Sequence, residues 1–191
     1  MSRTMSQIET APAAPARLDQ LVAGHNALFV YGTLQFDAVL TALLGRIPPG
    51  RPVSAPGWRA AALDNRLYPG LVATAPGTEA AGLLLTDLSR EEWAVLDAFE
   101  DDLYDLREVT LASGERGWSY VWTAGEVRDD DWDTDTFASF HLQQYAARCR
   151  RISARPAPDI RGATSTTPTR KADRLQRGNE PISPAPPGRC G

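Results

Sequence analysis

The sequence predicts an α+β fold in which a small mixed β-barrel is flanked by two or three helices. Strand-like and helix-like segments follow one another without the regular βαβ alternation that is typical of a doubly wound parallel sheet. A chain of 191 residues with 42% hydrophobic content is long enough for one core and rather short for two. No internal repeat is visible. We therefore expect a single folded domain.

The two ends of the chain differ in composition from the middle. Residues 1–24 are rich in Ala, Pro and Thr, and residues 153–191 hold seven of the fifteen prolines with few large apolar residues. Such segments bury too little apolar surface to offset the entropy lost on ordering them. We expect a disordered N-terminal segment (1–24), a folded domain (25–150) and a disordered Pro/Arg-rich tail (151–191).

The charge distribution gives little support for nucleic acid as a partner. The formal net charge is −4, although residues 151–191 alone carry eight basic and three acidic residues. These basic residues are dispersed and no aromatic residue lies among them, whereas segments that bind nucleic acid usually combine clustered charge with aromatic side chains. We expect a solvated tail and no nucleic-acid partner.

Cysteine content and hydropathy indicate the cellular compartment of the protein. Cys149 and Cys190 are too few to form a disulfide framework, which favours a reducing environment. The N-terminal segment lacks the apolar core of a signal peptide, and no segment approaches the length of a membrane span. We expect a cytoplasmic protein that does not contact the membrane.

Short strands and one helix account for the first half of the domain. A strand over 27–33 leads into a helix over 35–44, whose apolar residues recur at helical spacing and which Gly45 ends. Two prolines and a glycine within 51–63 predict a bent or edge strand there. The stretch LYPGLV (67–72) predicts a turn that feeds a short strand.

The second half contains two further helices. Residues 80–88 predict a buried strand, and Ser89 with Glu92 forms a Ser-x-x-Glu capping box that opens the next helix. Strands around 109–111 and 118–123 are expected to pair across the turn SGERG. Either Asp133 or Asp135 is expected to cap a last helix over 136–150.

The stretch LFVYGTLQFD (28–37) ends a strand at a glycine and begins a helix at once. Such a junction exposes backbone N–H groups that lack an acceptor. The glycine is explained by a tight turn alone, or by an anion or carbonyl oxygen bound to these amides. Phosphate-loop, dinucleotide and Gly-x-Ser-x-Gly motifs are absent from the sequence, which removes the main support for nucleotide and serine-hydrolase chemistry.

Metal and thiol chemistry also find little support. The acidic run DDDWDTD (129–135) is followed by Thr136 and Leu142 at the positions where a calcium loop needs glycine and a carboxylate. His141 and Cys149 are eight residues apart on one predicted helix, too far along its axis for their side chains to meet. We expect no metal site, a solvated acidic loop and no thiol–imidazole pair.

Glu100 is the candidate for acid–base chemistry. It directly follows an amphipathic helix in which Trp93, Leu96 and Phe99 recur at helical spacing. An apolar wall raises the pKa of a carboxyl group and so suits it to exchange a proton near neutral pH. The alternative, open for Glu100 as for its neighbours Asp101 and Asp102, is a plain solvated acid.

Three stretches in order resemble the γ-glutamylcyclotransferase-like superfamily, and most closely its branch of plant avirulence-induced proteins and γ-glutamylamine cyclotransferase. They are VYGTL (30–34), YPGLV (68–72) and LDAFEDDLYDLREVTL (96–111). The resemblance covers about residues 27–124 and implies a mixed α/β barrel. It implies that Glu100 is the acid–base residue and that the γ-glutamyl group binds to the loop formed by Tyr31, Gly32, Thr33 and Leu34.

The resemblance implies cyclisation of a small γ-glutamyl substrate to 5-oxoproline, with release of an amine and without metal or organic cofactor. Tyr104 is expected at the substrate pocket, with its ring packed and its hydroxyl available for a hydrogen bond. Leu106 replaces an arginine that the family usually has, so we expect Arg107 to form a surface ion pair. Substrate specificity is expected to depend on the NRLYPG turn (65–70) and the final helix.

Two other functions fit the same residues. One is a non-catalytic protein that binds or senses a small ligand on the same fold, and the other is acyl transfer to an external amine. The sequence leaves open which γ-glutamyl compound is the substrate and what the oligomeric state is.

Overall fold

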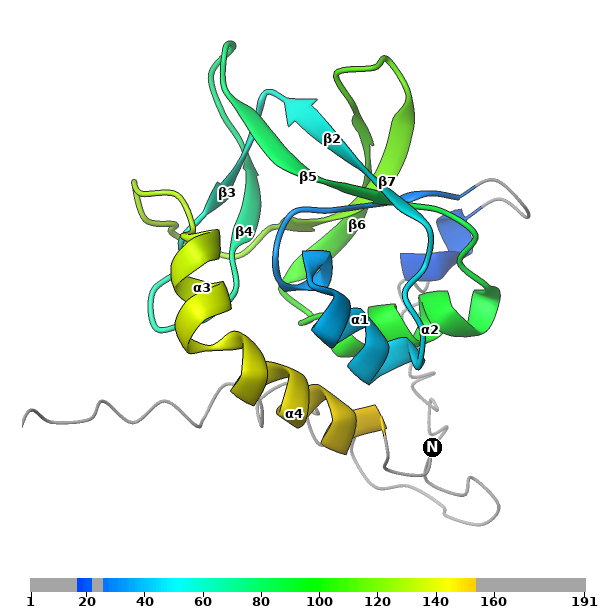
Figure 1. The fold of residues 1–191 in the computed structure, drawn as a ribbon. Coiled ribbons are helices and arrows are strands. Elements are labelled where there is room, and N and C mark those ends of the chain that lie inside the picture. The colour runs from blue at the N-terminus through cyan, green and yellow to red at the C-terminus, as the bar shows by residue number, and fades with distance from the viewer. Residues whose placement is uncertain (1–16, 22–25, 154–191) are drawn as a thin grey trace, which may run out of the picture.

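The computed structural model describes residues 17–21 and 26–153. In these ranges the chain forms a mixed sheet, a smaller sheet and several helices that gather beneath the strands (Figure 1). The elements in chain order are η1 (Arg17–Gln20), β1 (Leu28–Val30), η2 (Thr33–Gln35), α1 (Asp37–Leu44), β2 (Gly50–Pro56), β3 (Trp58–Ala61), β4 (Gly70–Ala73), β5 (Glu79–Leu85), α2 (Arg90–Phe99), β6 (Tyr104–Thr110), β7 (Arg116–Trp122), α3 (Thr134–Phe140) and α4 (Leu142–Ser153).

The main sheet has five strands in the order β2-β5-β1-β7-β6. Its central strand, β1, pairs antiparallel with β5, with Leu28 opposite Leu85, and parallel with β7, with Leu28 opposite Trp118. Strands β3 and β4 form a separate two-stranded sheet. The α+β class with a mixed sheet and flanking helices is therefore as predicted.

The predicted barrel is not confirmed. The edge strands of the main sheet are β2 and β6, and the ladders found among the described residues do not join them. A backbone hydrogen bond from Ala112 N to Ser54 O (2.9 Å) brings these edges close without pairing them. Pro52 and Pro56 in β2 lack N–H donors, which limits the ladder that this edge can form.

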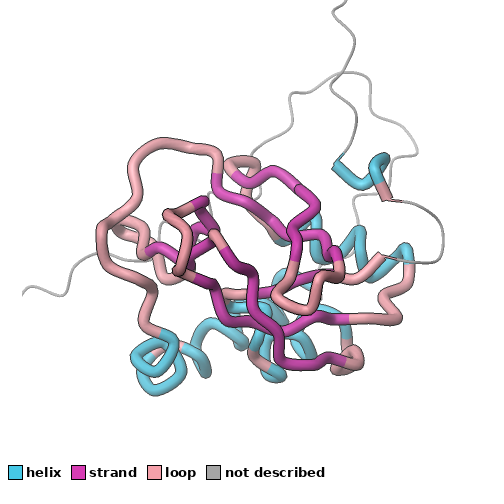
Figure 2. Tube along the Cα trace, turned by 90° about the horizontal axis from the view of Figure 1, so that it is seen from above, coloured by secondary structure: helices cyan, strands magenta, loops and turns pink. Residues whose placement is uncertain are grey.

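Both faces of the central strand β1 are buried, as its apolar run predicts. Leu28 and Val30 belong to a core cluster shared with the helices, whereas Phe29 belongs to a cluster on the opposite face with Leu71 of β4. Viewed from above, the strands occupy the centre and the helices lie around and behind them (Figure 2). The helices thus cover one face of β1, and the second cluster is formed by side chains from strands and the loops between them.

Local sequence signals account for the ends of the first two helices. Gly45 ends α1 in the left-handed conformation (φ 75°), and Asp37 lies in the first turn of α1. Ser89 and Glu92 form the predicted capping box at the start of α2, with Ser89 Oγ accepting from Glu92 N and Glu92 Oε2 accepting from Ser89 N. The predicted end of α1 at Gly45 and the predicted capping box of α2 are therefore confirmed.

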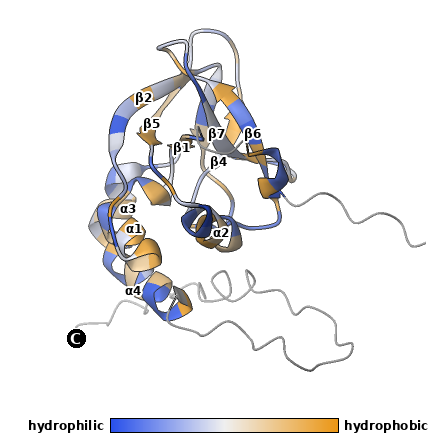
Figure 3. Ribbon diagram, turned by 90° about the vertical axis from the view of Figure 1, so that its right-hand side faces the viewer, coloured by the Kyte–Doolittle hydropathy of each residue, from blue (hydrophilic) through white to orange (hydrophobic). Residues whose placement is uncertain are grey.

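The single last helix predicted over 136–150 is wrong, because the structure has two helices there. Asp133 caps α3, accepting from Thr136 N (2.8 Å), but the chain bends at His141, and α4 runs on to Ser153. Phe137 packs against Trp132 on one side of the bend, and Tyr145 packs against Phe99 on the other. The two rings also contact each other across the bend, with centroids 5.4 Å apart, whereas residues eight positions apart in a straight helix are separated by about 12 Å along its axis. The amphipathic character of α4 is visible in Figure 3.

The N-terminal segment also differs in part from the expectation of disorder. Residues 17–20 form η1, and Leu18 and Leu21 pack against the helix-side core. The rest of the predicted terminal segments, including Cys190, lies outside the described residues. Among the helices of the described ranges, none is long and apolar enough to cross a membrane.

Candidate active site

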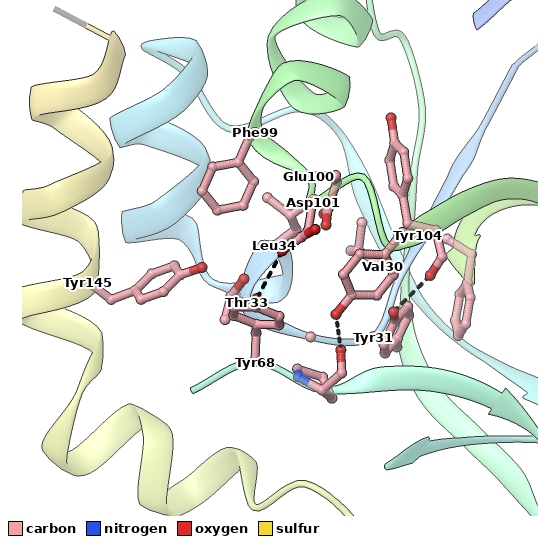
Figure 4. Close-up of a pocket in the computed structure, with 14 residues that line it drawn as sticks. Val30, Tyr31, Thr33, Leu34, Tyr68, Phe99, Glu100, Asp101, Tyr104 and Tyr145 are labelled. Carbon is pink, nitrogen blue, oxygen red and sulfur yellow. Dashed lines mark hydrogen bonds between the residues drawn. The ribbon is translucent and has the colours of Figure 1, made fainter. Parts of the chain in front are cut away.

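A pocket lies where β1 ends, between the loop that follows β1, the turn before β4 and the end of α2 (Figure 4). Its lining includes every residue that the sequence analysis singled out for the site: Tyr31, Gly32, Thr33, Leu34, Glu100 and Tyr104. Tyr68 and Pro69 from the NRLYPG turn and Tyr145 from α4 line it as well. Segments far apart in the sequence therefore meet at one cavity.

Glu100 enters the pocket because α2 ends at this residue. Its backbone is extended (φ −71°, ψ 146°), which turns the chain out of the helix just after Phe99. The side chain is half-buried, and burial raises the pKa of the carboxyl group to about 8. The Arg17 guanidinium opposes this shift, and the Asp97 and Asp101 carboxylates add to it. Glu100 can therefore exchange a proton near neutral pH.

The loop after β1 is shaped by its contact with the turn at Pro69. A Cβ atom on Gly32 would lie 2.9 Å from two carbons of the Pro69 ring, so only glycine fits without movement of the turn. Gln35 N donates to Gly32 O (3.1 Å) and closes the short 3-10 turn η2. Thr33 and Leu34 occupy the first positions of this turn, where the helical pattern supplies no acceptor for their amides.

The hydroxyls of Tyr31 and Tyr104 are engaged in structural hydrogen bonds. Tyr31 donates to Tyr120 O (2.8 Å) and accepts from Leu71 N (3.1 Å), while Tyr104 donates to Pro69 O (2.6 Å). Burial raises the pKa of both phenols. The Tyr104 ring packs edge-on against Trp122 at 5.1 Å. Both side chains therefore frame the pocket as neutral groups.

Asp101 is not the plain solvated acid that was one of the possibilities from the sequence. It is half-buried, its Oδ2 lies 3.3 Å from Arg66 Nη1, and its Oδ1 accepts from Leu103 N. Tyr68 lies beside this ion pair, with its hydroxyl 3.5 Å from Asp101 Oδ2 and hydrogen-bonded to Arg66. Burial raises the pKa of Tyr68 to about 12. Asp102, in contrast, is exposed.

Two parts of this environment, Arg66 and Arg17, are not among the predicted site residues. Arg66 lies in the NRLYPG turn that was singled out, but its pairing with Asp101 joins residues 35 positions apart. Arg17 lies in a segment predicted to be disordered, and it contacts the end of α2 next to Glu100. Long-range contacts of this kind leave no periodic signal in the sequence.

Other candidate residues have structural partners. Arg107 forms the expected exposed ion pair, with Asp105 (2.9 Å). In the acidic run, Asp133 caps α3 and Asp131 pairs with Arg59 (3.1 Å). Cys149 is fully buried, which raises the pKa of its thiol to about 12. The described part of the chain contains no group of three or more His, Cys, Asp or Glu placed to hold a metal ion.

The part of the chain that forms most of this pocket matches a known protein family. A family model described as gamma-glutamyl cyclotransferase, AIG2-like, matches residues 28–136, a range that holds the loop after β1, the Pro69 turn and Glu100. The chain belongs to this family. The match ends within α3, so η1 and α4 lie outside the matched residues.

Individual relatives agree with the AIG2-like assignment. AIG2-like protein D from Arabidopsis thaliana is 30% identical over 128 residues, which are 63% of this chain and 84% of the relative. A solution structure of another Arabidopsis thaliana protein matches with a TM-score of 0.50 and 25% identity, covering 66% of this chain and 89% of that one. The family relation thus extends over most of the folded region.

Proposed function

We propose that this protein is a γ-glutamylcyclotransferase that converts the γ-glutamyl group of a small γ-glutamyl amine or peptide into 5-oxoproline and releases the amine. The observation that carries the proposal is the half-buried carboxyl group of Glu100, with a pKa near 8, in the pocket of an AIG2-like domain. Such a group holds and returns a proton at physiological pH.

The reaction needs one proton shuttle. The Glu100 carboxylate takes a proton from the substrate α-ammonium, and the freed amine attacks the γ-carbonyl carbon of the same molecule. The new C–N bond closes a five-membered lactam as the carbonyl oxygen becomes an oxyanion. The oxyanion then collapses, and the bond to the leaving nitrogen breaks as Glu100 returns its proton to that nitrogen. Glu100 next takes the second proton that the positively charged ring nitrogen still carries, which leaves a neutral lactam, and passes it to the released amine or to water. Because nucleophile and electrophile share one molecule, correct folding of the substrate supplies much of the rate.

The loop after β1 is proposed to bind the γ-glutamyl group. The amides of Thr33 and Leu34 lie in the pocket lining at the start of η2, where they are suited to donate to a substrate carboxylate or to the developing oxyanion. Tyr31 and Tyr104 hold the walls around the substrate through their hydroxyl bonds. The steps proposed here need neither metal nor organic cofactor. A cytoplasmic location stays a prediction.

The test is release of 5-oxoproline from a panel of γ-glutamyl amines, γ-glutamyl amino acids and glutathione. We expect wild-type protein to form 5-oxoproline from at least one compound. Glu100→Gln should lower kcat by about 10²–10⁴-fold, the range for loss of a general acid–base group. Asp102→Asn is the matched control, because it neutralises an exposed carboxylate two positions away, and it should keep wild-type turnover.

The other outcomes distinguish the alternative functions. A γ-glutamyl product on an added amine, in place of 5-oxoproline, would indicate acyl transfer. Binding of panel compounds to folded wild-type protein without any product would indicate a ligand-binding protein. Equal turnover by wild type and Glu100→Gln would remove Glu100 from the mechanism.

A further inference from the structure

A single arginine of the N-terminal turn η1 holds the end of α2. Arg17 Nη1 donates to the carbonyls of Asp101 (3.1 Å) and Tyr104 (2.9 Å), and Nη2 donates to the carbonyl of Asp97 (2.9 Å). Its Nε lies 3.0 Å from Asp97 Oδ1. The three carbonyls lie on both sides of Glu100 along the chain, so one guanidinium spans the segment that carries this residue.

This contact suits the end of a helix. The last carbonyls of α2 lack donors within the helix and form the negative end of its dipole, which favours a cation. A guanidinium group offers five N–H donors in a planar fork and so bonds several carbonyls at once, which an ammonium group at one point does not. Arg17 therefore fixes the path by which the chain leaves α2 and enters β6.

The turn η1 is itself anchored to the domain. Leu18 and Leu21 pack against the helix-side core, and Gln20 Nε2 donates to Leu106 O (3.3 Å). The Arg17 guanidinium lies 5.5 Å from the centroid of the Tyr120 ring, and its exposed side-chain fraction is 22%. Its charge is partly shielded from water and acts more strongly than that of an exposed arginine.

We propose that Arg17 is a positioning residue for Glu100, holding the segment from Asp97 to Tyr104 so that the Glu100 carboxyl faces the pocket and offsetting the charge of the carboxylates beside it. The inference rests on the proposed acid–base role of Glu100. Arg17 lies outside residues 28–136, the part of the chain that matches the family model.

The charges around Glu100 determine the direction in which loss of the Arg17 charge should change the pKa of Glu100. Asp97 and Asp101 favour its neutral form, and Arg17 favours its charged form. Asp101 is itself paired with Arg66. Within residues 17–21 and 26–153, five phenols also interact with Glu100: Tyr31, Tyr68, Tyr104, Tyr120 and Tyr145. Removal of the Arg17 charge therefore leaves two acids beside Glu100, and the pKa of Glu100 should rise further.

The test follows the Glu100 carboxyl carbon by NMR during a pH titration of the full chain labelled with ¹³C-glutamate, with Glu100→Gln assigning the signal. We expect Arg17→Gln to raise the titration midpoint by about one unit, a tenfold change in proton affinity. Arg17→Lys should stay close to wild type, because it retains the charge. The matched control is Arg46→Gln, since Arg46 bonds Glu92 and the Asp87 carbonyl at the opposite end of α2, and its midpoint should not move.

Turnover adds a second readout. We expect Arg17→Gln to shift the pH profile of kcat/KM toward higher pH. Arg17→Lys should keep the wild-type pH profile but have a lower kcat, since one ammonium does not span three carbonyls. An unchanged Glu100 midpoint in folded Arg17→Gln overturns the inference. If that variant does not fold, wild-type kcat in Arg17→Lys overturns it. If wild-type protein forms no 5-oxoproline, the proposed function fails while the titration still decides the role of Arg17.

Discussion

At the scale of single residues, Glu100 makes stability depend on pH. Its pKa is about 8 in the folded protein, against an ordinary value of 4.5. Between these values the folded state binds more protons than the unfolded state, so the free energy of unfolding falls as pH rises through this window. Stability associated with Glu100 is thus fully present below about pH 4.5 and lost by about pH 8.

Glu100→Gln is expected to remove this dependence. Glutamine resembles the protonated acid, so the variant should match wild type in stability at pH 5 and exceed it at pH 9 by about 1–3 kcal/mol. Urea unfolding at the two pH values measures the difference. Asp102→Asn changes an exposed carboxylate and should show no such gain. If the difference in stability between Glu100→Gln and wild type is the same at pH 5 and pH 9, the raised pKa of Glu100 is contradicted.

Gly32→Ala is expected to destabilise the protein through one close contact. The new Cβ would meet the Pro69 ring at 2.9 Å, which forces the loop and the turn apart. We expect a loss of about 1–3 kcal/mol in the free energy of unfolding, measured by urea denaturation. Pro69→Ala removes the opposing ring atoms, so the double variant should recover part of the loss. Strictly additive effects of the two substitutions would show that the contact is not the cause.

At the scale of elements, the Tyr31 hydroxyl joins three strands. It sits on the loop directly after β1, donates to the carbonyl of Tyr120 in β7 and accepts from the amide of Leu71 in β4. The small sheet and the main sheet are therefore linked at the pocket by one side chain. The Tyr104 hydroxyl makes a single bond, to Pro69 O.

Tyr31→Phe is expected to cost more stability than Tyr104→Phe. The first leaves a buried amide and a buried carbonyl without their partner, and the second leaves one carbonyl, so we expect losses of about 2–3 and about 1 kcal/mol respectively. Thermal unfolding of both variants at neutral pH measures the order. Equal losses would indicate that the Leu71 amide finds another acceptor when the hydroxyl is removed.

At the scale of the whole molecule, the sheet couples two cores. Leu40 lies in the helix-side cluster and Leu71 in the cluster on the opposite face, and both are fully buried. The strands between them contribute side chains to both clusters in alternation. We therefore expect the two cores to unfold together in one cooperative transition.

Substitutions in either core should lower one common transition. We expect Leu40→Ala and Leu71→Ala each to reduce the free energy of unfolding by about 2–5 kcal/mol. Far-UV circular dichroism and tryptophan fluorescence should follow the same curve, because Trp93 packs in the first cluster and Trp58 against the second. Two separate transitions in either variant would show that the faces unfold independently.

Much of the element order could be predicted because its signals are local. The capping box at Ser89, the left-handed glycine after α1 and the strand pair around the SGERG turn each depend on residues a few positions apart. The bend at His141 could not be predicted, because it follows from where Phe137 and Tyr145 meet the core.

The α+β class and the types of most elements could be read from the chain alone, since propensity, capping and periodicity act over short distances, and the three stretches that resemble the family are likewise short and local. Three features emerge only in the folded chain: β1 runs parallel to β7, the edge strands of the main sheet stay unpaired with each other, and Arg17 and the Arg66–Asp101 pair surround the Glu100 segment. These features join residues tens of positions apart, and their free energy depends on geometry that no local pattern specifies.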